Sequence, residues 1–163
     1  MKKKYLTIAL WVIAAIWIGF IWWNSSKPGT ESGAMSGSVT DMVNAIVNKI
    51  FPSIEISHHF IRKFAHFSEF AVLGSLLCVS TSFAFGISRA SSVKKYLLSL
   101  IALPCAITVA AIDECIQLFV PGRAGAFGDV LIDSSGAATG VLLVFAILLL
   151  IRLLHKKESA ECA

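Results

Sequence analysis

The chain has 163 residues, 56% of them hydrophobic, and its mean hydropathy is +0.78. This length indicates one domain, residues 1–163, and the apolar residues come in blocks, a pattern typical of an integral membrane protein rather than a soluble one. The formal net charge is +4, but most basic residues stand at the ends of apolar blocks, where they act as topology signals. The charge pattern therefore argues against nucleic acid as a partner.

The first apolar block covers residues 5–23 and follows a run of three lysines. A signal peptide has a similar basic start, but its apolar core is shorter and ends at a small-residue cleavage site. This block is long enough to span a bilayer and ends in Trp22-Trp23, which suits the membrane interface. We predict an uncleaved first transmembrane helix.

The next segment is rich in Ser and Gly and contains Pro28, so it predicts a flexible outer loop over residues 24–38. Residues 39–51 place apolar side chains at helical spacing, with Ser38 as a candidate N-cap and Pro52 as a stop. We expect a short amphipathic helix there, lying on the membrane surface or against the bundle.

Three further apolar blocks predict transmembrane helices over residues 60–83, 96–120 and 130–154. Pro104 predicts a kink in the third helix, which neighbouring helices can tolerate. The predicted fold class is all-α, a polytopic membrane protein with four transmembrane helices and one short amphipathic helix in the first outer loop.

Basic residues flank these blocks at the amino terminus, in the 89–95 loop and at the carboxyl terminus. They are Lys2, Lys3, Lys4, Arg89, Lys94, Lys95, Arg152, Lys156 and Lys157. Because basic residues favour the cytoplasmic side, we predict a multi-pass protein of the cytoplasmic membrane with both termini in the cytoplasm. The polar ends of the second, third and fourth spans then meet at the outer face.

Ionisable residues gather at that face, on one stripe of each helix. At about 100° per residue, one stripe each is formed by Arg62 with His66 and Glu69, by Asp113 with Gln117, and by Asp129 with Asp133, Gly136 and Gly140. The glycines allow helices to approach closely, so the acids of the last stripe should face the bundle. Ionisable groups in a membrane segment indicate a functional site.

The acids of this cluster outnumber its basic residues by five to three. The acids are Glu69, Asp113, Glu114, Asp129 and Asp133, and the basic residues are Arg62, Lys63 and Arg123. Protonated His66, protonated carboxylic acids or a divalent cation could compensate for the difference. If a cation binds, the oxygen-rich ligands favour Mg²⁺, Mn²⁺ or Ca²⁺ over zinc.

A purely structural interpretation is the alternative for each single residue. Arg62 could pair with Glu69, Arg123 could pair with Asp129 or Asp133, and Pro121-Gly122 could form only a tight turn. For the whole set we favour function, because a structural bundle can pack without so many ionisable groups at one end.

Three blocks, RKFAHFSEF, DECIQLFVPGR and GDVLIDSSG, follow one another on successive spans. In this combination the chain resembles the VanZ-like family of small bacterial membrane proteins over about residues 10–154, with residues 24–57 the least similar part. The resemblance implies a four-helix bundle in the bacterial cytoplasmic membrane and, as for the founding member, resistance to teicoplanin-type lipoglycopeptides. The polar motif residues that it carries over are Arg62, Lys63, His66, Glu69, Asp113, Glu114, Gln117, Arg123, Asp129 and Asp133.

One hypothesis is that the outer site binds or acts on a lipid-linked cell-wall intermediate or a lipoglycopeptide. Its expected ligand-binding residues are Arg62, Lys63, Gln117 and Arg123. In a non-catalytic binder, neutralising Asp133 would change affinity without any product being formed. Another alternative is a small transporter, which would require a homodimer to enclose a pathway.

The enzyme alternative is a metal-dependent phosphohydrolase or phosphotransferase acting on a lipid head group. Its candidate catalytic residues are His66 as general base, Glu69 as the group that orients it, and Asp113 and Glu114. Asp129 and Asp133 would hold Mg²⁺. The spacing Gly125-x3-Asp129-x3-Asp133 is similar to the tail of the CDP-alcohol phosphotransferase signature, whose leading half is absent here.

Overall fold

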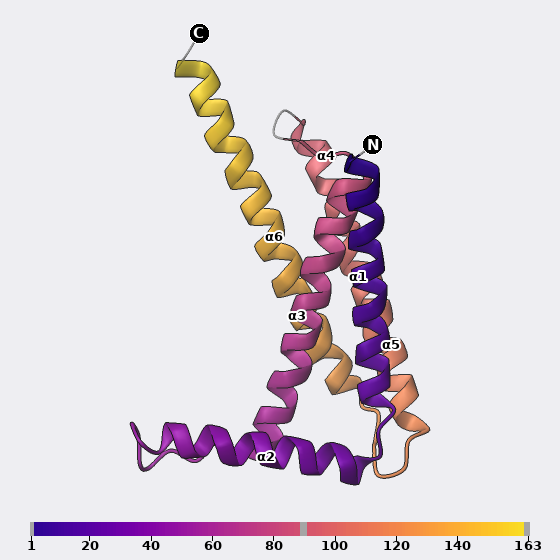
Figure 1. Cartoon of the computed structure of the whole chain (residues 1–163), viewed down its shortest axis with the longest axis vertical. Coiled ribbons are helices and arrows are strands. Elements are labelled where there is room, and N and C mark those ends of the chain that lie inside the picture. The colour runs from indigo at the N-terminus through magenta and orange to yellow at the C-terminus, as the bar shows by residue number, and fades with distance from the viewer. Residues whose placement is uncertain (1, 89–90, 162–163) are drawn as a thin grey trace.

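Four long helices make up most of the chain, and the computed structural model describes residues 2–88 and 91–161. They are α1 (Lys2–Ser25), α3 (His58–Ala84), α5 (Ala102–Leu118) and α6 (Phe127–Glu161). These helices run along one another, and α2 (Gly29–Val47) lies across one end of the bundle (Figure 1). The short helix α4 (Val93–Leu97) and a 3₁₀ segment, Leu98–Ile101, lead into α5. The predicted all-α fold is confirmed.

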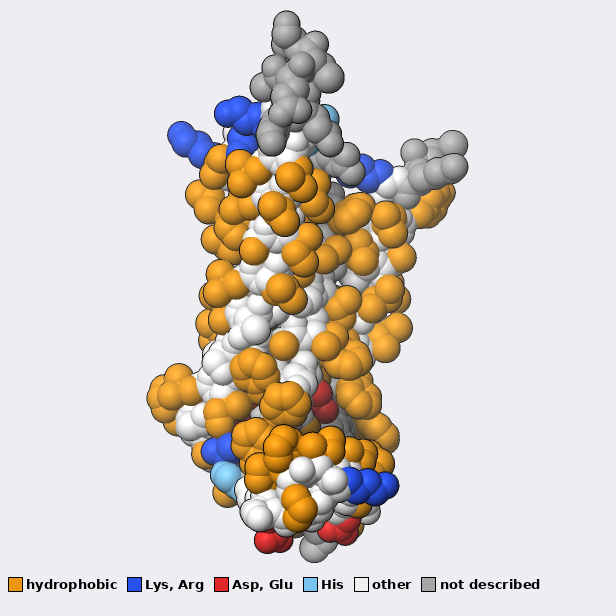
Figure 2. Space-filling model, turned by 90° about the vertical axis from the view of Figure 1, so that its left-hand side faces the viewer, with side chains coloured by type: hydrophobic (Ala, Val, Ile, Leu, Met, Phe, Trp, Pro, Cys, Tyr) orange, Lys and Arg blue, Asp and Glu red, His pale blue; other side chains and the backbone are white. Residues whose placement is uncertain are grey.

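Four stretches are long and apolar enough to cross a membrane. They are Lys3–Ser25, His58–Ala84, Val93–Leu118 and Phe127–Lys156, and each overlaps one predicted span. Helices satisfy their own backbone hydrogen bonds, as hydrocarbon surroundings require. Hydrophobic side chains cover much of the length of the bundle in Figure 2, which is the surface expected of a protein surrounded by lipid.

The third span is not one regular helix. Pro104 lies in the first turn of α5, directly after the 3₁₀ segment. Since proline has no N–H to donate and its ring disfavours a preceding helical turn, the tighter segment just before it has a local cause. The interruption therefore lies beside the proline for which a kink is predicted.

Close packing of α3 against α6 depends on glycines. A Cβ at Gly136 would collide with the carbonyl oxygen of Phe67, and one at Gly140 with that of Ala71. Buried Phe70 and Leu73, on the same stretch of α3, belong to the apolar core. The close approach predicted for the Gly136–Gly140 stripe is confirmed, and it brings the polar first turns of α6 against α3.

The region between α1 and α3 differs from its prediction. Residues 24–38 were expected to form a flexible loop, but α2 begins at Gly29, directly after Pro28. Proline suits the start of a helix because it needs no hydrogen bond partner there. The serines of this stretch also bond back within the helix, as in Ser36 Oγ to the carbonyl of Ser32 at 2.7 Å. Glycine and serine content alone therefore misled the prediction.

The separate amphipathic helix over residues 39–51 is not confirmed. The single helix α2 ends at Val47, well before Pro52, and its N-cap is Pro28 instead of Ser38. Asn44 holds the returning chain, since its side chain bonds both the N–H (2.8 Å) and the carbonyl (3.0 Å) of Ile56. This contact turns the backbone toward the start of α3.

The two ends of the bundle carry different groups. The start of α1, the end of α6 and the short helix α4 lie at one end, and α2 lies at the other (Figure 1). Lys94 and Lys95 stand in α4 at the first end, whereas Arg89 lies outside the described residues. Which end faces the cytoplasm stays a prediction. The polar motif residues lie near the α2 end.

Candidate functional site

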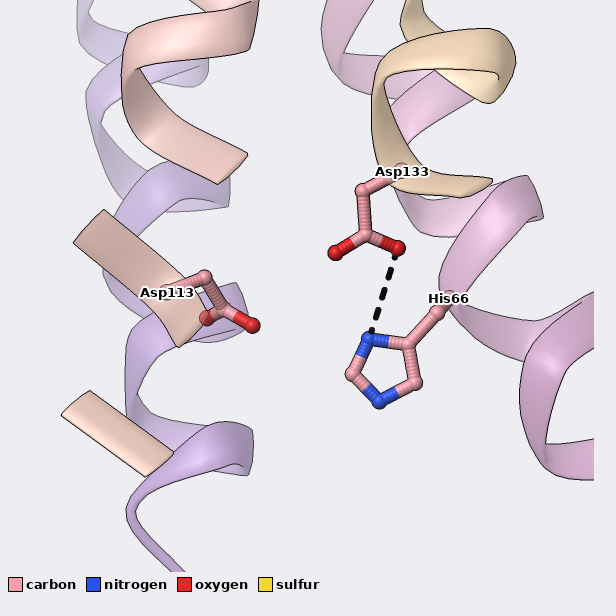
Figure 3. A group of neighbouring side chains, drawn as sticks. All are labelled: His66, Asp113 and Asp133. Carbon is pink, nitrogen blue, oxygen red and sulfur yellow. Dashed lines mark ion pairs between the residues drawn. The ribbon is translucent and has the colours of Figure 1, made fainter. Parts of the chain in front are cut away.

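Three buried or half-buried side chains meet where α3, α5 and α6 approach one another near the α2 end. His66 comes from α3, Asp113 from α5 and Asp133 from α6, and both aspartates have 0% of their surface exposed. One nitrogen or oxygen atom from each residue lies within 4.8 Å of the others. The side chains point into a common space in Figure 3.

His66 and Asp133 are the closer pair, with Nδ1 3.8 Å from Oδ1. That distance is longer than a hydrogen bond. In the described part of the chain, five buried side-chain polar atoms have no hydrogen bond partner, and four of them are His66 Nδ1, Asp113 Oδ1 and both oxygens of Asp133. Buried polar atoms are normally paired, so four unpaired ones in a single cluster need a specific explanation, such as a water, an ion or a chemical role.

Hydrogen bonds hold Asp113 by one oxygen only. Its Oδ2 accepts from Ser25 Oγ at 2.8 Å and from Gln117 Nε2 at 3.1 Å. Gln117 Nε2 also lies 3.1 Å from Glu114 Oε1, and Glu114 Oε2 accepts from the backbone N–H of Ala126 at 2.9 Å. These bonds fix both acids while leaving Asp113 Oδ1 free.

Arg123 closes the α2 end of the site from the loop between α5 and α6. Its guanidinium donates to the carbonyls of Lys27 and Asn24, both at 3.2 Å, and Nη1 lies 3.4 Å from Gln117 Oε1. Burial and the neighbouring Arg62 lower the pKa of Arg123 below its usual value, but a guanidinium still keeps its charge at neutral pH. Arg123 thus fixes a positive charge while tying the two connecting loops together.

The other two basic residues stand on α3. Lys63 Nζ pairs with Asp129 Oδ1 at 3.3 Å, and both side chains are partly exposed. Arg62 is exposed. Among the described motif residues, Lys63 pairs with Asp129 and His66 with Asp133, and no pair joins Arg62 to Glu69 or Arg123 to an aspartate.

A polar cavity of about 200 Å³ lies among these groups. Its walls carry the three basic side chains and several of the motif acids. The motif residues that line this cavity are Arg62, Lys63, His66, Glu114, Gln117, Arg123, Asp129 and Asp133. A second cavity of about 190 Å³ lies between α1, α2 and α3 and shares Arg62, His66 and Arg123 with the first. Met35, Val39 and Ile61 give this second cavity apolar surface, and its polar lining includes Asn24, Ser25 and Glu69.

The structure brings all ten sequence-predicted site residues to one end of the bundle, but it pairs them differently from the prediction. Glu69 was expected to orient His66, yet its carboxylate accepts from Asn24 Nδ2 at 3.2 Å, and Asp133 is the acid beside His66. Asp129 was expected to hold a cation with Asp133, yet it pairs with Lys63. The chemical roles proposed for these residues stay predictions.

Sequence reasoning missed the contribution of α1. Asn24 and Ser25, placed in a loop by prediction, end α1 and bond to Glu69 and Asp113. Trp17 Nε1 also donates to the backbone carbonyl of Glu69 at 3.0 Å. One signal could have found the pair, since Asn24 and Ser25 are the first polar residues after Trp22-Trp23 and so stand at the membrane level of the motif acids.

Comparison with known families gives one result that decides the family. The VanZ/LLP1 family model matches residues 10–151, which is most of the chain. The chain belongs to the VanZ/LLP1 family. No curated protein and no solved structure matches it.

Membership in the VanZ/LLP1 family confirms the resemblance found in the three sequence blocks. The match begins within α1 and ends within α6, so it takes in all four membrane-length helices. The polar motif residues lie inside it as well. The site is therefore part of the family domain and not of an added segment.

Proposed function

We propose that this VanZ/LLP1 protein binds the anionic head group of a lipid-linked molecule of the bacterial cell envelope. The observation that carries the proposal is the polar cavity lined by Arg62, Lys63 and Arg123 at the end of four membrane-length helices. Guanidinium groups match phosphate and carboxylate oxygens in geometry and charge. At this level of the bundle, a head group could enter while its tail stays in the bilayer.

The second cavity supports a lipid-linked ligand over a free anion. It adjoins the polar cavity through Arg62 and Arg123, and Met35, Val39 and Ile61 line it. Apolar walls next to cationic groups suit an amphipathic molecule, because each part of the ligand then meets a surface of its own kind. The second cavity would receive the first part of the apolar stem.

In the cell, we propose that this binding occurs at the outer leaflet and contributes to resistance against teicoplanin-class lipoglycopeptides. These antibiotics carry an acyl chain, so they and their lipid-linked target meet at the same interface. A protein that holds the target or the antibiotic there would change how often the two meet. The family resemblance supports this role.

The binding experiment uses the purified full-length protein in detergent, with a polyisoprenyl diphosphate as the probe and phosphatidylcholine as the neutral comparator. Arg62→Gln is the informative variant, because Arg62 is exposed and its loss should leave the fold intact. We expect it to weaken diphosphate binding by about tenfold, as for loss of one charge-assisted hydrogen bond of roughly 1.5 kcal/mol. Equal affinity for the two lipids in the wild type would contradict the proposal.

Lys49→Gln is the matched control, since Lys49 is exposed and follows α2 outside both cavities. It removes the same charge and should leave binding unchanged. The cellular test expresses wild type, Arg62→Gln or Lys49→Gln in a sensitive Gram-positive host at equal membrane levels. Protection against teicoplanin but not vancomycin, lost only in Arg62→Gln, is the expected result. No protection by the wild type would refute the role in resistance and leave the binding result standing.

A further inference from the structure

We infer that His66, Asp113 and Asp133 bind a divalent transition-metal cation, Mn²⁺ or Zn²⁺, at the junction of α3, α5 and α6. The three residues come from three helices, and each offers one ligand atom within 4.8 Å of the others. Both aspartates are completely buried. This site differs from the one that the sequence predicts, because His66 and Asp113 take the place of Asp129.

The unpaired atoms carry the inference. Both oxygens of Asp133, Oδ1 of Asp113 and Nδ1 of His66 are buried and have no hydrogen bond partner among the described residues. Burying a polar group without a partner costs several kcal/mol, and two carboxylates in one space add repulsion. A cation would satisfy all three residues at once.

A metal site also requires that its ligands be held in place, and the surroundings of Asp113 do this. Ser25 and Gln117 both donate to Oδ2, and Oδ1 remains free to face the cluster. Metal-binding carboxylates are commonly oriented in this way by outer hydrogen bonds. The glycine contact of α3 with α6 brings the helices that carry His66 and Asp133 close together.

The ligand set selects the cation. One imidazole nitrogen with two carboxylate oxygens suits first-row transition ions better than Mg²⁺ or Ca²⁺, which take oxygen ligands only. Ligand bonds of about 2.1 Å place ligand atoms about 3.4 Å apart around a tetrahedral ion. Since the ligand atoms here lie within 4.8 Å of one another, the cluster would contract by up to about 1.4 Å on binding, which side-chain rotations can supply.

Three protein ligands leave further coordination positions open. His66 and Asp133 also line the polar cavity, where Arg62 and Arg123 supply positive charge. A phosphate or carboxylate oxygen in that cavity could complete the coordination. This last step rests on the proposed function, whereas the cation site itself does not.

The test is Mn²⁺ binding by the full-length protein in detergent, purified through a tag without histidine, stripped with chelator and supplied with no lipid ligand. We expect a single Mn²⁺ per chain by calorimetry, and a nitrogen coupling in its pulsed electron paramagnetic resonance spectrum. Asp133→Asn and Asp113→Asn should each weaken binding by more than about 100-fold, since loss of outer partners alone costs 10–100-fold. His66→Gln should abolish the nitrogen coupling.

Asp129→Asn is the matched control, because Asp129 lines the same cavity one helical turn before Asp133 but pairs with Lys63. It should keep its Mn²⁺ affinity within about threefold. A loss equal to that of Asp133→Asn would move the cation to the Asp129–Asp133 pair and overturn the inference. The wild type would also overturn the inference if calorimetry detected neither Mn²⁺ nor Zn²⁺ binding, or if Mn²⁺ bound without nitrogen coupling. Both results come from the wild type, so they hold even if the aspartate variants fail to fold. Since no lipid is present, these outcomes are independent of the anion-binding test.

Discussion

Lys63 on α3 and Asp129 on α6 form an ion pair, with Nζ 3.3 Å from Oδ1. The pair lies on the wall of the polar cavity and engages the acid that spacing alone would assign to a metal. Because 36% and 29% of the two side chains are exposed, water screens the attraction. The pair therefore shapes the cavity more than it stabilises the bundle.

A double-mutant cycle on this pair should confirm that it contributes little. We expect Lys63→Gln, Asp129→Asn and the double variant to give a coupling free energy of about 0.2–1 kcal/mol, the range of exposed ion pairs. Reversible unfolding in detergent measures it. A coupling of several kcal/mol would mean that the pair is desolvated in the membrane and acts as a structural bridge.

The contact of α3 with α6 should tolerate no side chain at its glycines. Gly136→Ala places a Cβ against the backbone carbonyl of Phe67, which cannot rotate away as a side chain would. We expect destabilisation of about 1–3 kcal/mol, as for overpacking in a core, measured by thermal unfolding. Gly19→Ala is the control, since a Cβ at Gly19 has no atom within 4 Å, and it should unfold no earlier than the wild type.

Arg123 should act through its planar guanidinium as well as its charge. Lysine keeps the charge but cannot reach the carbonyls of Lys27 and Asn24 at the same time. We expect Arg123→Lys to speed amide hydrogen exchange at Gly29, whose N–H bonds to the carbonyl of Pro121 at 3.0 Å between the loops that Arg123 joins. Arg62→Lys, a change at an exposed site, should leave this exchange rate unchanged.

The predicted orientation is open to a direct test with reporters. Basic residues at the end that holds both termini favour the cytoplasm for that end. We expect green fluorescent protein to fluoresce when fused to either terminus, and alkaline phosphatase to be active when inserted after Ser53, in the connection between α2 and α3. Non-fluorescent terminal fusions together with inactive phosphatase after Ser53 would reverse the topology and place the cavity on the cytoplasmic side.

The single-helix stripes were predictable because they need only helical periodicity. Asp113 and Gln117 were expected to be neighbours on one helix, and Gln117 Nε2 lies 3.1 Å from Asp113 Oδ2. Pairings between helices were not predictable. Asp133, and not Glu69, is the acid beside His66. This pairing depends on how α3 is rotated against α6, which cannot be read from the sequence.

By itself, the amino-acid sequence determined the four membrane-length helices, the family and the end of the bundle at which polar groups gather. The length of an apolar block and the placement of charges beside it can be read from each segment alone, because each spanning helix must match the thickness of the bilayer by itself. Only the tertiary structure decided that α2 starts at Gly29, that Asn24 and Ser25 of α1 join the site, and which acid meets which base. These features depend on how closely helices approach and how they are rotated, and glycine contacts and long-range hydrogen bonds set both.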